Sequence, residues 1–570
     1  TDAVGRMTVR NSKIVGDTLA TMPNDNAKSA IWVGVAHGSV SVPGILEVEE
    51  GANVQTKVLA GTTAKDKGVI RQTGGVLANV GNNDATGAPL LASAGYAGQE
   101  LSGGVYEQQG QTENAKSTTA EFVLRQSGGL YSVTNHVCDA GKGVCLKTGN
   151  GRADFYVGGG EMRNEGTYVF IVDTGTTGST VFTVDGTDTK VYGKSYMAYG
   201  ASGKGGTFIL NLNGGLLDLD YFTKYQASTT CKAYLNAGGG TIQIRKSGSN
   251  PPVADRITLY PGGFTFRDVG QNVTMTIPLE APTGLGVSAV PVPAELSSAV
   301  LVGPPLVVID ETGTDGQGFG ASAIALFDKT TGKVTGVQVT CPGRDYTEAT
   351  ATFHYADQSW TAVCSLTENS TAGGFTKDGP GQLYFETPNT YGGPTVVRQG
   401  GLSAKCDWAI PSNTVLRLEG GNIGLGATAC AFKSIGGTSG NVGFSGAKTF
   451  TVETLIPGTT DAVKFNNSTM KVTGETRFDV AKVLAGETTT YGTDITFDEG
   501  STIALDNVAL LDTEDADKAS PITLMTVTSG KQISGIPTWT NRPADGEWKM
   551  RVTLTGVKLV KQRGMLMIVR

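Results

Sequence analysis

The chain repeats one local pattern of hydrophobic and polar positions: a short alternating apolar run, a Gly-Gly step and a second alternating run. In one clear copy, residues 69 to 72 precede the glycines and residues 76 and 77 follow them. A two-residue alternation predicts β-strands, and paired glycines predict turns that need positive φ or close backbone approach. The step recurs at Gly74 and Gly75, Gly128 and Gly129, Gly214 and Gly215, Gly238 and Gly239, Gly262 and Gly263, Gly400 and Gly401, and Gly420 and Gly421.

Strand-turn-strand units at intervals of roughly 20 to 30 residues are typical of proteins in which each repeat stacks on the next. The pattern therefore predicts an all-β fold of the β-solenoid class. Composition agrees with this prediction, because 81 of the 570 residues are glycine, about twice the average frequency near 7%. Charged residues make up 17% of the chain, below the usual value of about 25%.

Shifts in composition divide the chain into four regions. Closely spaced prolines between residues 278 and 305 cannot continue a ladder of central strands. We expect an N-terminal β-solenoid over residues 1–280 and a proline-rich linker over 281–300. A small glycine-rich β module should then span residues 301–372, and a C-terminal β-solenoid ending in a β cap should span 373–570.

One segment of the C-terminal region resembles a known family. Residues 381–402 contain the step Asn389-Thr390-Tyr391-Gly392-Gly393, followed by Thr395, Val397 and Leu402. This segment resembles the autotransporter-associated β-strand repeat of bacterial surface proteins. The resemblance implies a right-handed parallel β-helix that is secreted or exposed at the cell surface, without implying a particular activity.

Cysteine usage indicates an oxidising compartment. A disulfide between nearby cysteines would close a short loop, although six cysteines allow 15 connectivities. The alternative, seven unrelated buried thiols, stays open because free cysteine is often a small core residue. The candidate pairs are Cys138 with Cys145, Cys341 with Cys364, and Cys406 with Cys430, which leaves Cys231 alone.

The best acidic pair for catalysis is Asp218 with Asp220. Two-residue spacing directs both carboxylates to one face of a strand, and a glycosidase would hold its carboxyl groups about 5 to 9 Å apart. A polar outer face beside an inward leucine stripe explains the same pattern, and we favour it. The histidines His37, His136 and His354 lie in unrelated contexts. We therefore expect no catalytic residues and no enzyme.

Two segments contain residues that could bind a metal ion. His136 lies near Cys138 and Cys145, but a disulfide loop fits this spacing better than zinc. The acidic glycine loop of residues 310–316 lacks the spacing of known calcium loops, so we predict a plain turn and keep calcium as the alternative. We expect no other cofactor.

Charge and hydropathy exclude two classes of partner. The net charge is −7, and no cluster of Lys and Arg provides the basic surface that nucleic acids require. No apolar run is long enough to cross a membrane as a helix. The sequence favours a secreted or cell-surface structural or adhesive protein that self-assembles into filaments or arrays, or contacts other surface proteins or glycans. The alternatives are a polysaccharide-binding or polysaccharide-cleaving β-helix protein, and a phage or secretion-system fibre.

Overall fold

The structure is a computed structural model, and the chain divides into two compact units. The first comprises Thr1–Lys246, Asn250–Thr265 and Leu279–Gly373. The second comprises Ser247–Ser249, Phe266–Pro278 and Gly374–Arg570. The structure describes residues 4–15, 30–34, 36–37, 40–80, 90–109, 112–134, 144–148, 150–164, 168–172, 178–199, 206–224, 231–246, 254–314, 316–412, 414–426, 430–455, 463–544 and 546–562.

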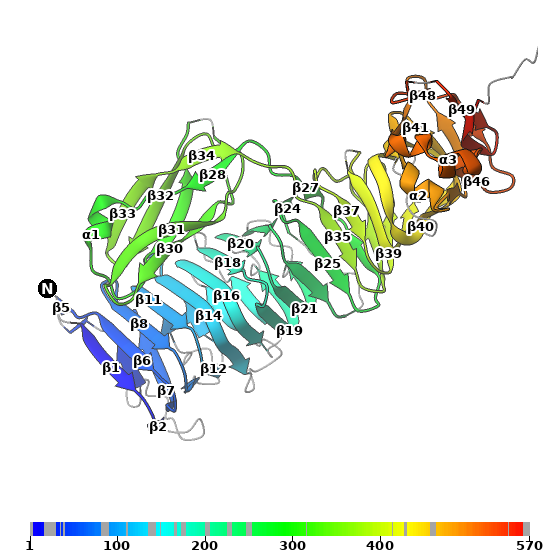
Figure 1. The fold of residues 1–570 in the computed structure, drawn as a ribbon. Helices are drawn as coiled ribbons and strands as arrows, with labels where there is room; N and C mark the ends of the chain where they lie inside the picture. Colours follow the sequence, from blue (N-terminus) through cyan, green and yellow to red (C-terminus); the bar gives the residue numbers. More distant parts are fainter. Residues whose placement is uncertain are drawn as a thin grey trace, which may run out of the picture. The chain divides into compact units, whose positions relative to one another are not determined.

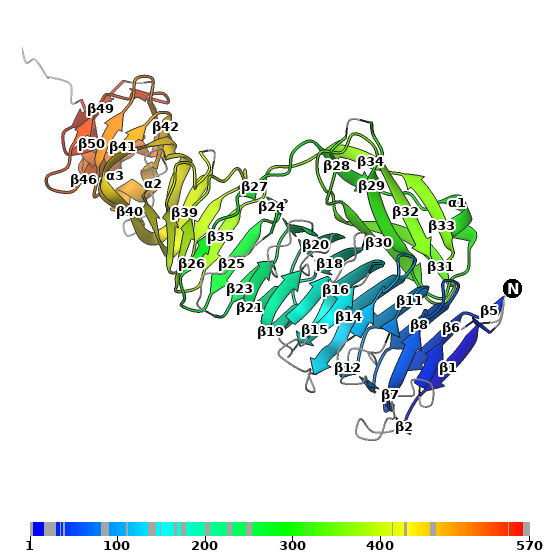
Figure 2. The same cartoon turned by 180° about the vertical axis from the view of Figure 1, so that it is seen from behind.

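The first unit is built from strands that pair in parallel with strands of the next repeat (Figure 1). Within the ranges just given, these pairings form three ladders, which we call A, B and C. The strands of ladder A stack side by side in Figures 1 and 2. They are β1 (Gly5–Val9), β6 (Gly44–Val48), β8 (Lys67–Gln72), β11 (Tyr96–Leu101), the first parts of β14 (Glu121–Thr134) and β16 (Arg152–Asn164), β18 (Ser179–Val184), β20 (Gly206–Leu212), β22 (Cys231–Ala237), β24 (Arg256–Leu259) and β27 (Leu279–Glu280).

The repeats continue from ladder A into ladder B and then into ladder C. Long strands such as β14 and β16 pass from ladder A into ladder B without a break. Ladder B contains β2 (Lys13–Val15), the start of β7 (Asn53–Ala60), β9 (Val76–Val80), β12 (Val105–Gln109), the later parts of β14 and β16, the starts of β19 (Lys190–Tyr199) and β21 (Leu216–Lys224), and β23 (Thr241–Ile244). Ladder C contains β3 (Ala30–Val33), the end of β7, β10 (Leu90–Leu91), β13 (Thr112–Asn114), β15 (Val144–Thr148), β17 (Tyr168–Val172) and the ends of β19 and β21, while β4 (Ala36–His37) and β5 (Val40–Ser41) form a separate hairpin.

The register of ladder A agrees with the predicted repeat length. From β6 to β27, paired residues are separated by 22 positions, as between Tyr234 and Arg256, up to 31 positions, as between Val123 and Asp154; Gly5 and Gly44, at the start of the ladder, are 39 positions apart. Because neighbouring strands keep this register, equivalent side chains line up in rows across the ladder. The outward rows are Lys67, Tyr96, Glu121, Arg152, Ser179, Thr207 and Lys232; Ile45, Val69, Gly98, Val123, Asp154, Val181, Ile209, Tyr234 and Arg256; and Glu47, Arg71, Glu100, Arg125, Tyr156, Thr183, Asn211, Asn236, Thr258 and Glu280.

The inward side chains of ladder A form an apolar core. Phe155 and Phe182 are paired in register and fully buried, with ring centroids 6.3 Å apart. Phe122 packs on Phe155 at 5.3 Å, and Leu210 and Leu235 continue the buried stack. Burying a side chain of this kind contributes roughly 1.5 to 3 kcal/mol. The two-residue alternation in the sequence therefore corresponds to an inward apolar face and an outward polar face.

Glycines occupy corners at which successive repeats touch. Gly129 has φ +70°, and a Cβ atom there would lie 2.7 Å from the carbonyl oxygen of Gly104 in the preceding repeat. Gly160, one repeat later, has φ +75° and stands in the same relation to Gly129. A side chain at such a corner would need both a rare backbone conformation and space that the neighbouring backbone fills. The predicted glycines that have positive φ are Gly75, Gly129, Gly215, Gly239, Gly262, Gly263, Gly400 and Gly420.

A separate β region, which we call the insert, follows ladder A in the first unit. Its small sheets are antiparallel, in contrast to the ladders. The segment expected as a proline-rich linker contributes a strand and a helix to it, and β28 pairs with β34. The elements are β28 (Leu285–Ala289), α1 (Ala294–Ser298), β29 (Leu306–Glu311), β30 (Ser322–Asp328), β31 (Lys333–Cys341), β32 (Ala349–Tyr355), β33 (Gln358–Val363) and β34 (Ser365–Glu368).

The second unit also contains parallel ladders and ends in a mixed sheet. The boundary between the units crosses β25 (Phe264–Asp268). The parallel strands of the second unit are β26 (Val273–Met275), β35 (Phe375–Asp378), β36 (Gln382–Phe385), β37 (Thr395–Val397), β38 (Gly401–Ala404), β39 (Val415–Leu425), β40 (Ala431–Leu455), β41 (Val463–Val472), β42 (Glu475–Asp479), β44 (Asp494–Phe497), β45 (Thr502–Asp506), β47 (Ile533–Ser534) and β48 (Thr538–Trp539). The mixed sheet contains β43 (Thr489–Tyr491), β46 (Ile522–Val527), β49 (Trp548–Thr553) and β50 (Gly556–Lys561), accompanied by α2 (Val480–Leu484), η2 (Val508–Asp512) and α3 (Glu514–Ala519).

In the second unit, residues of the segment that resembles the autotransporter-associated repeat connect successive turns of the chain. The buried Asn389 side chain donates a hydrogen bond to the carbonyl oxygen of Ala409 at 2.5 Å. Tyr391 is also buried, and its hydroxyl lies 2.6 Å from that of Thr395. The Thr395 hydroxyl lies 2.9 Å from that of Thr414 in the following turn. The Asn-Thr-Tyr step therefore has a structural role here.

Candidate functional site

The insert covers the outer face of ladder A, as both views in Figures 1 and 2 show. Val69 and Val123 of the ladder share one buried cluster with Phe353 of the insert. The rings of Tyr96 and Tyr355 are 4.5 Å apart, and the Tyr96 hydroxyl donates a 2.7 Å hydrogen bond to the Pro304 carbonyl. Outward residues of the ladder are therefore buried where the insert packs on them.

Polar side chains extend this contact along ladder A. The fully buried Asn211 donates a hydrogen bond of 2.7 Å to the Ser322 hydroxyl of the insert. Asn236, one strand further along the same outward row, donates to Asn211 at 3.0 Å and to the Gly320 carbonyl at 3.3 Å. Buried amides of this kind are costly unless they are paired. Their pairing therefore fixes the register of the insert on the ladder.

The same outward row carries alternating charges under the insert. Arg71 lies 3.2 Å from Glu100 and donates a 2.6 Å hydrogen bond to the Val302 carbonyl. Burial raises the pKa of Glu100, although Arg71 opposes that shift. Arg125 pairs with Asp154 at 2.6 Å. A cavity of about 330 Å³ adjoins these residues, but their charges are already used in contacts within the protein.

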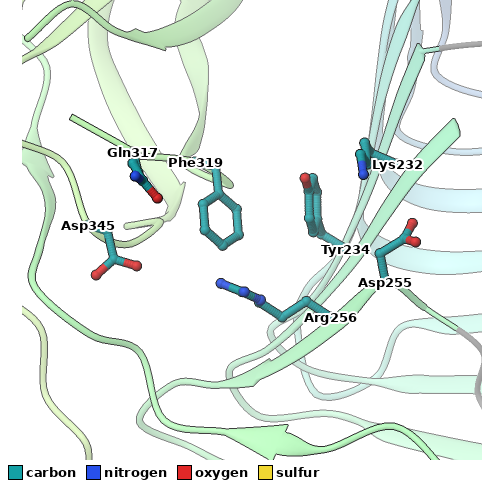
Figure 3. Close-up of a pocket in the computed structure, with 7 residues that line it drawn as sticks. All are labelled: Lys232, Tyr234, Asp255, Arg256, Gln317, Phe319 and Asp345. Atoms are coloured by element: carbon teal, nitrogen blue, oxygen red, sulfur yellow. The ribbon is translucent and has the colours of Figure 1, made fainter. Parts of the chain in front are cut away.

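A larger pocket of about 560 Å³ lies where the glycine-rich loop of the insert meets strands β22 and β24. Its ladder side comes from the outward positions of these strands and the turn before β24. Its other side comes from two loops of the insert, as Figure 3 shows. The lining residues are Lys232, Tyr234, Asp255, Arg256, Gln317, Phe319 and Asp345.

Aromatic rings and guanidinium groups define the inner wall of this pocket. Phe319 and Tyr234 approach each other with ring centroids 5.1 Å apart (Figure 3). The Arg256 guanidinium lies 5.0 Å from the centroid of Phe319, and that of Arg344 lies 5.7 Å away. Glu280 forms an ion pair with Arg256 at 3.4 Å and accepts a 2.8 Å hydrogen bond from Arg344. Arg256 and Arg344 are therefore held in place by both their charge and their planar faces.

The loops of the insert are organised by two carboxylates. Burial disfavours ionisation of Glu311, but the N–H groups of Gly313, Thr347, Glu348 and Gly318 outweigh it and hold the pKa of Glu311 below its usual range. Asp345 adopts φ +60° and accepts hydrogen bonds from the Thr283 hydroxyl at 2.6 Å and from Arg344 at 2.9 Å. Hydrogen bonds within the protein therefore fix the loops of the insert that line the pocket.

This arrangement is suited to binding. Asp255, Asp345 and Gln317 offer hydrogen-bond acceptors, while Lys232 and Arg256 offer donors. Burial and the nearby Asp255 raise the pKa of the Tyr234 phenol. Donors, acceptors and aromatic surface together can recognise a polar molecule that has an apolar face.

The predicted acidic pair lies elsewhere in the first unit, on β21. Arg245 lies 3.0 Å from Asp218 and 3.4 Å from Asp220, and Lys246 pairs with Asp220 at 2.7 Å. Leu217 and Leu219, which alternate with them along the strand, are fully buried. The two carboxylates therefore share one face, as the spacing predicts, and both are engaged in ion pairs.

The structure does not support the disulfides predicted within its described residues. None of Cys341, Cys364, Cys406 and Cys430 is joined in a disulfide, so the predicted pairings of Cys341 with Cys364 and of Cys406 with Cys430 are wrong. Proximity in sequence was a poor guide to these pairings. Cys341 is buried at the end of β31, where its sulfur accepts a hydrogen bond from the Gly343 N–H, and burial raises the pKa of its thiol to about 12. The predicted pair of Cys138 and Cys145 lies outside the residues whose side chains are described.

His354 and the acidic glycine loop also have structural contacts. His354 lies 3.7 Å from Glu121, whose other oxygen accepts a 2.7 Å hydrogen bond from the Ala356 N–H. In the loop of residues 310–316, the Glu311 carboxylate is occupied by backbone N–H groups. The described side chains contain no group of three or more His, Cys, Asp or Glu residues that could hold a metal ion. His136 lies outside the described residues, and nothing is described of the side chain of His37.

Sequence reasoning did not find the pocket. Tyr234 and Arg256 have the alternation expected of outward strand positions, which predicts exposure but not what covers them. Arg344 and Asp345 were not among the candidate site residues either. Residues of the two walls are about 60 to 110 positions apart in the sequence, and local patterns do not report such contacts.

Comparison with family models, with curated proteins and with solved structures gives no match for this chain. The fold and the site therefore define the class on their own: an all-β protein whose long parallel ladders carry an antiparallel insert. In the part of the chain that the structure describes, no helix has the length and apolar character needed to cross a membrane.

Proposed function

We propose that this chain is a secreted or cell-surface structural and adhesive protein without a catalytic role, built as a right-handed parallel β-solenoid. The observation that carries the proposal is the continuous register of ladder A, from β1 to β27. Each repeat shares backbone hydrogen bonds with its neighbours and adds to one continuous apolar interior. Such a body is stiff and long, as a surface protein requires.

The location at the cell surface is supported by the resemblance of residues 381–402 to the autotransporter-associated repeat. In that segment Asn389 and Thr395 connect successive turns of the second unit, and Tyr391 contacts Thr395. A low content of charged residues is compatible with a rod made of thin, repeated layers.

Self-assembly would use the ends of the ladders. A terminal strand presents unpaired N–H and carbonyl groups to which another chain can add. Strand β1 pairs with β6 on one side, and Met7 on β1 is 42% exposed. We propose that association occurs through such strand addition and yields filaments or surface arrays.

Electron microscopy of the purified chain over a range of concentrations tests this proposal. We expect ordered filaments or arrays that shorten or disappear in Met7→Lys, because a lysine on an edge strand discourages strand addition. The control is Ile536→Lys, at an 86% exposed position outside the strands, which should assemble normally. Isolated particles at every concentration would contradict the structural proposal.

A second function, polysaccharide binding or cleavage, is favoured by one observation: the aromatic and guanidinium lining of the pocket at Tyr234, Arg256 and Phe319. Cleavage would require two carboxyl groups placed across the scissile bond. The two carboxylates of the pocket are engaged within the protein: Asp255 accepts from the Ala233 N–H, and Asp345 accepts from the Thr283 hydroxyl and Arg344. Asp218 and Asp220 lie outside the pocket and are held by Arg245 and Lys246. The observation therefore favours binding over cleavage.

A further inference from the structure

The pocket between β22, β24 and the loops of the insert is formed by residues that ladder packing alone does not explain. A structural rod needs no cavity of about 560 Å³, and this volume lies within the range of roughly 300 to 1,000 Å³ that is usual for small-molecule sites. Both walls belong to the first unit, and the paired amides Asn211 and Asn236 fix the insert beside the pocket. The question is which ligand this lining would select.

Charge argues for an uncharged ligand. The cations at or directly behind the pocket are Lys232, Arg256 and Arg344. The anions there are Asp255, Glu280 and Asp345, so the two sets balance. Arg256 and Arg344 are both paired with Glu280, and Asp345 is paired with Arg344. A charged ligand would have to displace these partners, whereas a neutral ligand would not.

The geometry of the polar groups argues for hydroxyl groups. Carboxylates and the Gln317 amide accept hydrogen bonds, and Lys232, Arg256 and the same amide donate them. A hydroxyl can donate and accept at once, so neighbouring hydroxyls on one ring can bridge an acceptor and a donor. Tyr234 adds a half-buried aromatic surface against which the C–H face of a ring can pack.

The important groups are also ordered before a ligand arrives. Asp345 is fixed by the Thr283 hydroxyl and Arg344, and Asp255 accepts a 2.8 Å hydrogen bond from the Ala233 N–H. Arg256 is held by Glu280 and Phe319. Preorganisation lowers the entropy lost on binding.

From these observations we infer that the pocket binds a neutral saccharide unit, with Tyr234 packing on the sugar ring and Asp255, Asp345, Arg256 and Gln317 bonding its hydroxyls. This inference rests on the binding function described above as the second candidate. It is independent of self-assembly, so either can fail without the other.

The test is a glycan array probed with the full chain, followed by calorimetry with the best neutral oligosaccharide. We expect neutral glycans to bind, Tyr234→Ala to weaken binding at least tenfold, and Gln317→Ala to weaken it roughly threefold to tenfold, as for one hydrogen bond. Gln317 is exposed, so its substitution tests the site without endangering the fold. Tyr384→Ala is the matched control, since Tyr384 is, like Tyr234, a half-buried tyrosine on a strand, but lies outside the pocket.

Three results would overturn the inference. The first is an array that shows no binding, and the second is binding of acidic glycans alone. The third is neutral-glycan affinity that Tyr234→Ala and Gln317→Ala leave unchanged, whether or not filaments form. Normal binding of neutral glycans without filaments would instead count against the self-assembly proposal and leave the inference about the pocket intact.

Discussion

Ladder A and the insert bury aromatic residues of the same kind in different ways. In the ladder, Phe155 and Phe182 face inward and stack on their counterparts in neighbouring repeats. In the insert, Phe353 lies in an antiparallel sheet, and its cluster includes outward residues of the ladder such as Val69 and Val123. The core of the ladder is formed by its own repeats, whereas the core of the insert includes side chains of the ladder. Loss of the ladder should therefore disorder the insert, but not the reverse.

Truncation of a core phenylalanine on each side gives the largest expected effect. Phe155→Ala and Phe353→Ala should each cost about 3 to 5 kcal/mol, because both rings are fully buried. Hydrogen exchange with mass spectrometry should separate them: Phe155→Ala should raise exchange in ladder and insert, and Phe353→Ala in the insert alone. Equal exchange patterns in the two variants would break the asymmetry.

A glycine corner of the ladder should be the next most sensitive position. Gly129→Ala adds a methyl group 2.7 Å from the Gly104 carbonyl at φ +70°. Gly500→Ala is the matched control, with φ +85° and nothing within 4 Å. Backbone strain alone costs about 1 to 2 kcal/mol, so the control should lose that amount in urea denaturation and Gly129→Ala clearly more. Equal losses of unfolding free energy in the two variants would mean that the neighbouring repeats shift to make room for the extra methyl group.

The contact between insert and ladder should depend on pH through two buried groups with opposite effects. Burial raises the pKa of Glu121 to about 7, so its contribution to stability is present below about pH 4 and is lost as the pH rises to 7. Burial lowers the pKa of His354 to about 4, so its contribution is present above about pH 6.5 and is lost as the pH falls to 4. The charged neighbours Arg152, Lys67 and Asp357 act on Glu121, and Arg152 acts on His354.

In the native chain these two effects should largely cancel between pH 4.5 and 6.5. Glu121→Gln removes one of them, so the thermal stability of the variant should rise with pH across this window. His354→Gln should show the opposite slope. Parallel pH profiles for the native chain and both variants would show that neither group titrates on unfolding.

The acidic pair on ladder B should give the smallest effect. Asp218→Asn leaves Arg245 paired with Asp220 at 3.4 Å, and partly exposed ion pairs contribute about 1 kcal/mol or less. Urea denaturation should therefore detect at most that loss, with assembly unchanged. A loss of several kcal/mol would assign this pair a larger structural role than its exposure suggests.

The difference between the two regions also explains what the sequence could predict. Alternation around Phe155 and the Gly128-Gly129 step are local signals, so strands, turns and parallel repeats could be predicted from them. The docking of the insert depends on contacts such as Arg71 to Val302, which are 231 positions apart, and no local pattern reports them. For the same reason the pairings of Cys341 with Cys364 and of Cys406 with Cys430 were predicted wrongly, and Tyr234, Phe319 and Asp345 were missed.

The packing of the insert on ladder A is the central claim, and zero-length cross-linking tests it most directly. Lys67 of β8 and Asp357 of the insert form an ion pair at 3.0 Å, so a carbodiimide should join them by an amide bond. We expect mass spectrometry of the digested chain to find this cross-link together with the control pair Lys471 and Asp498, also 3.0 Å apart within the second unit. Recovery of the control without the Lys67–Asp357 product would contradict the packing, and with it the pocket.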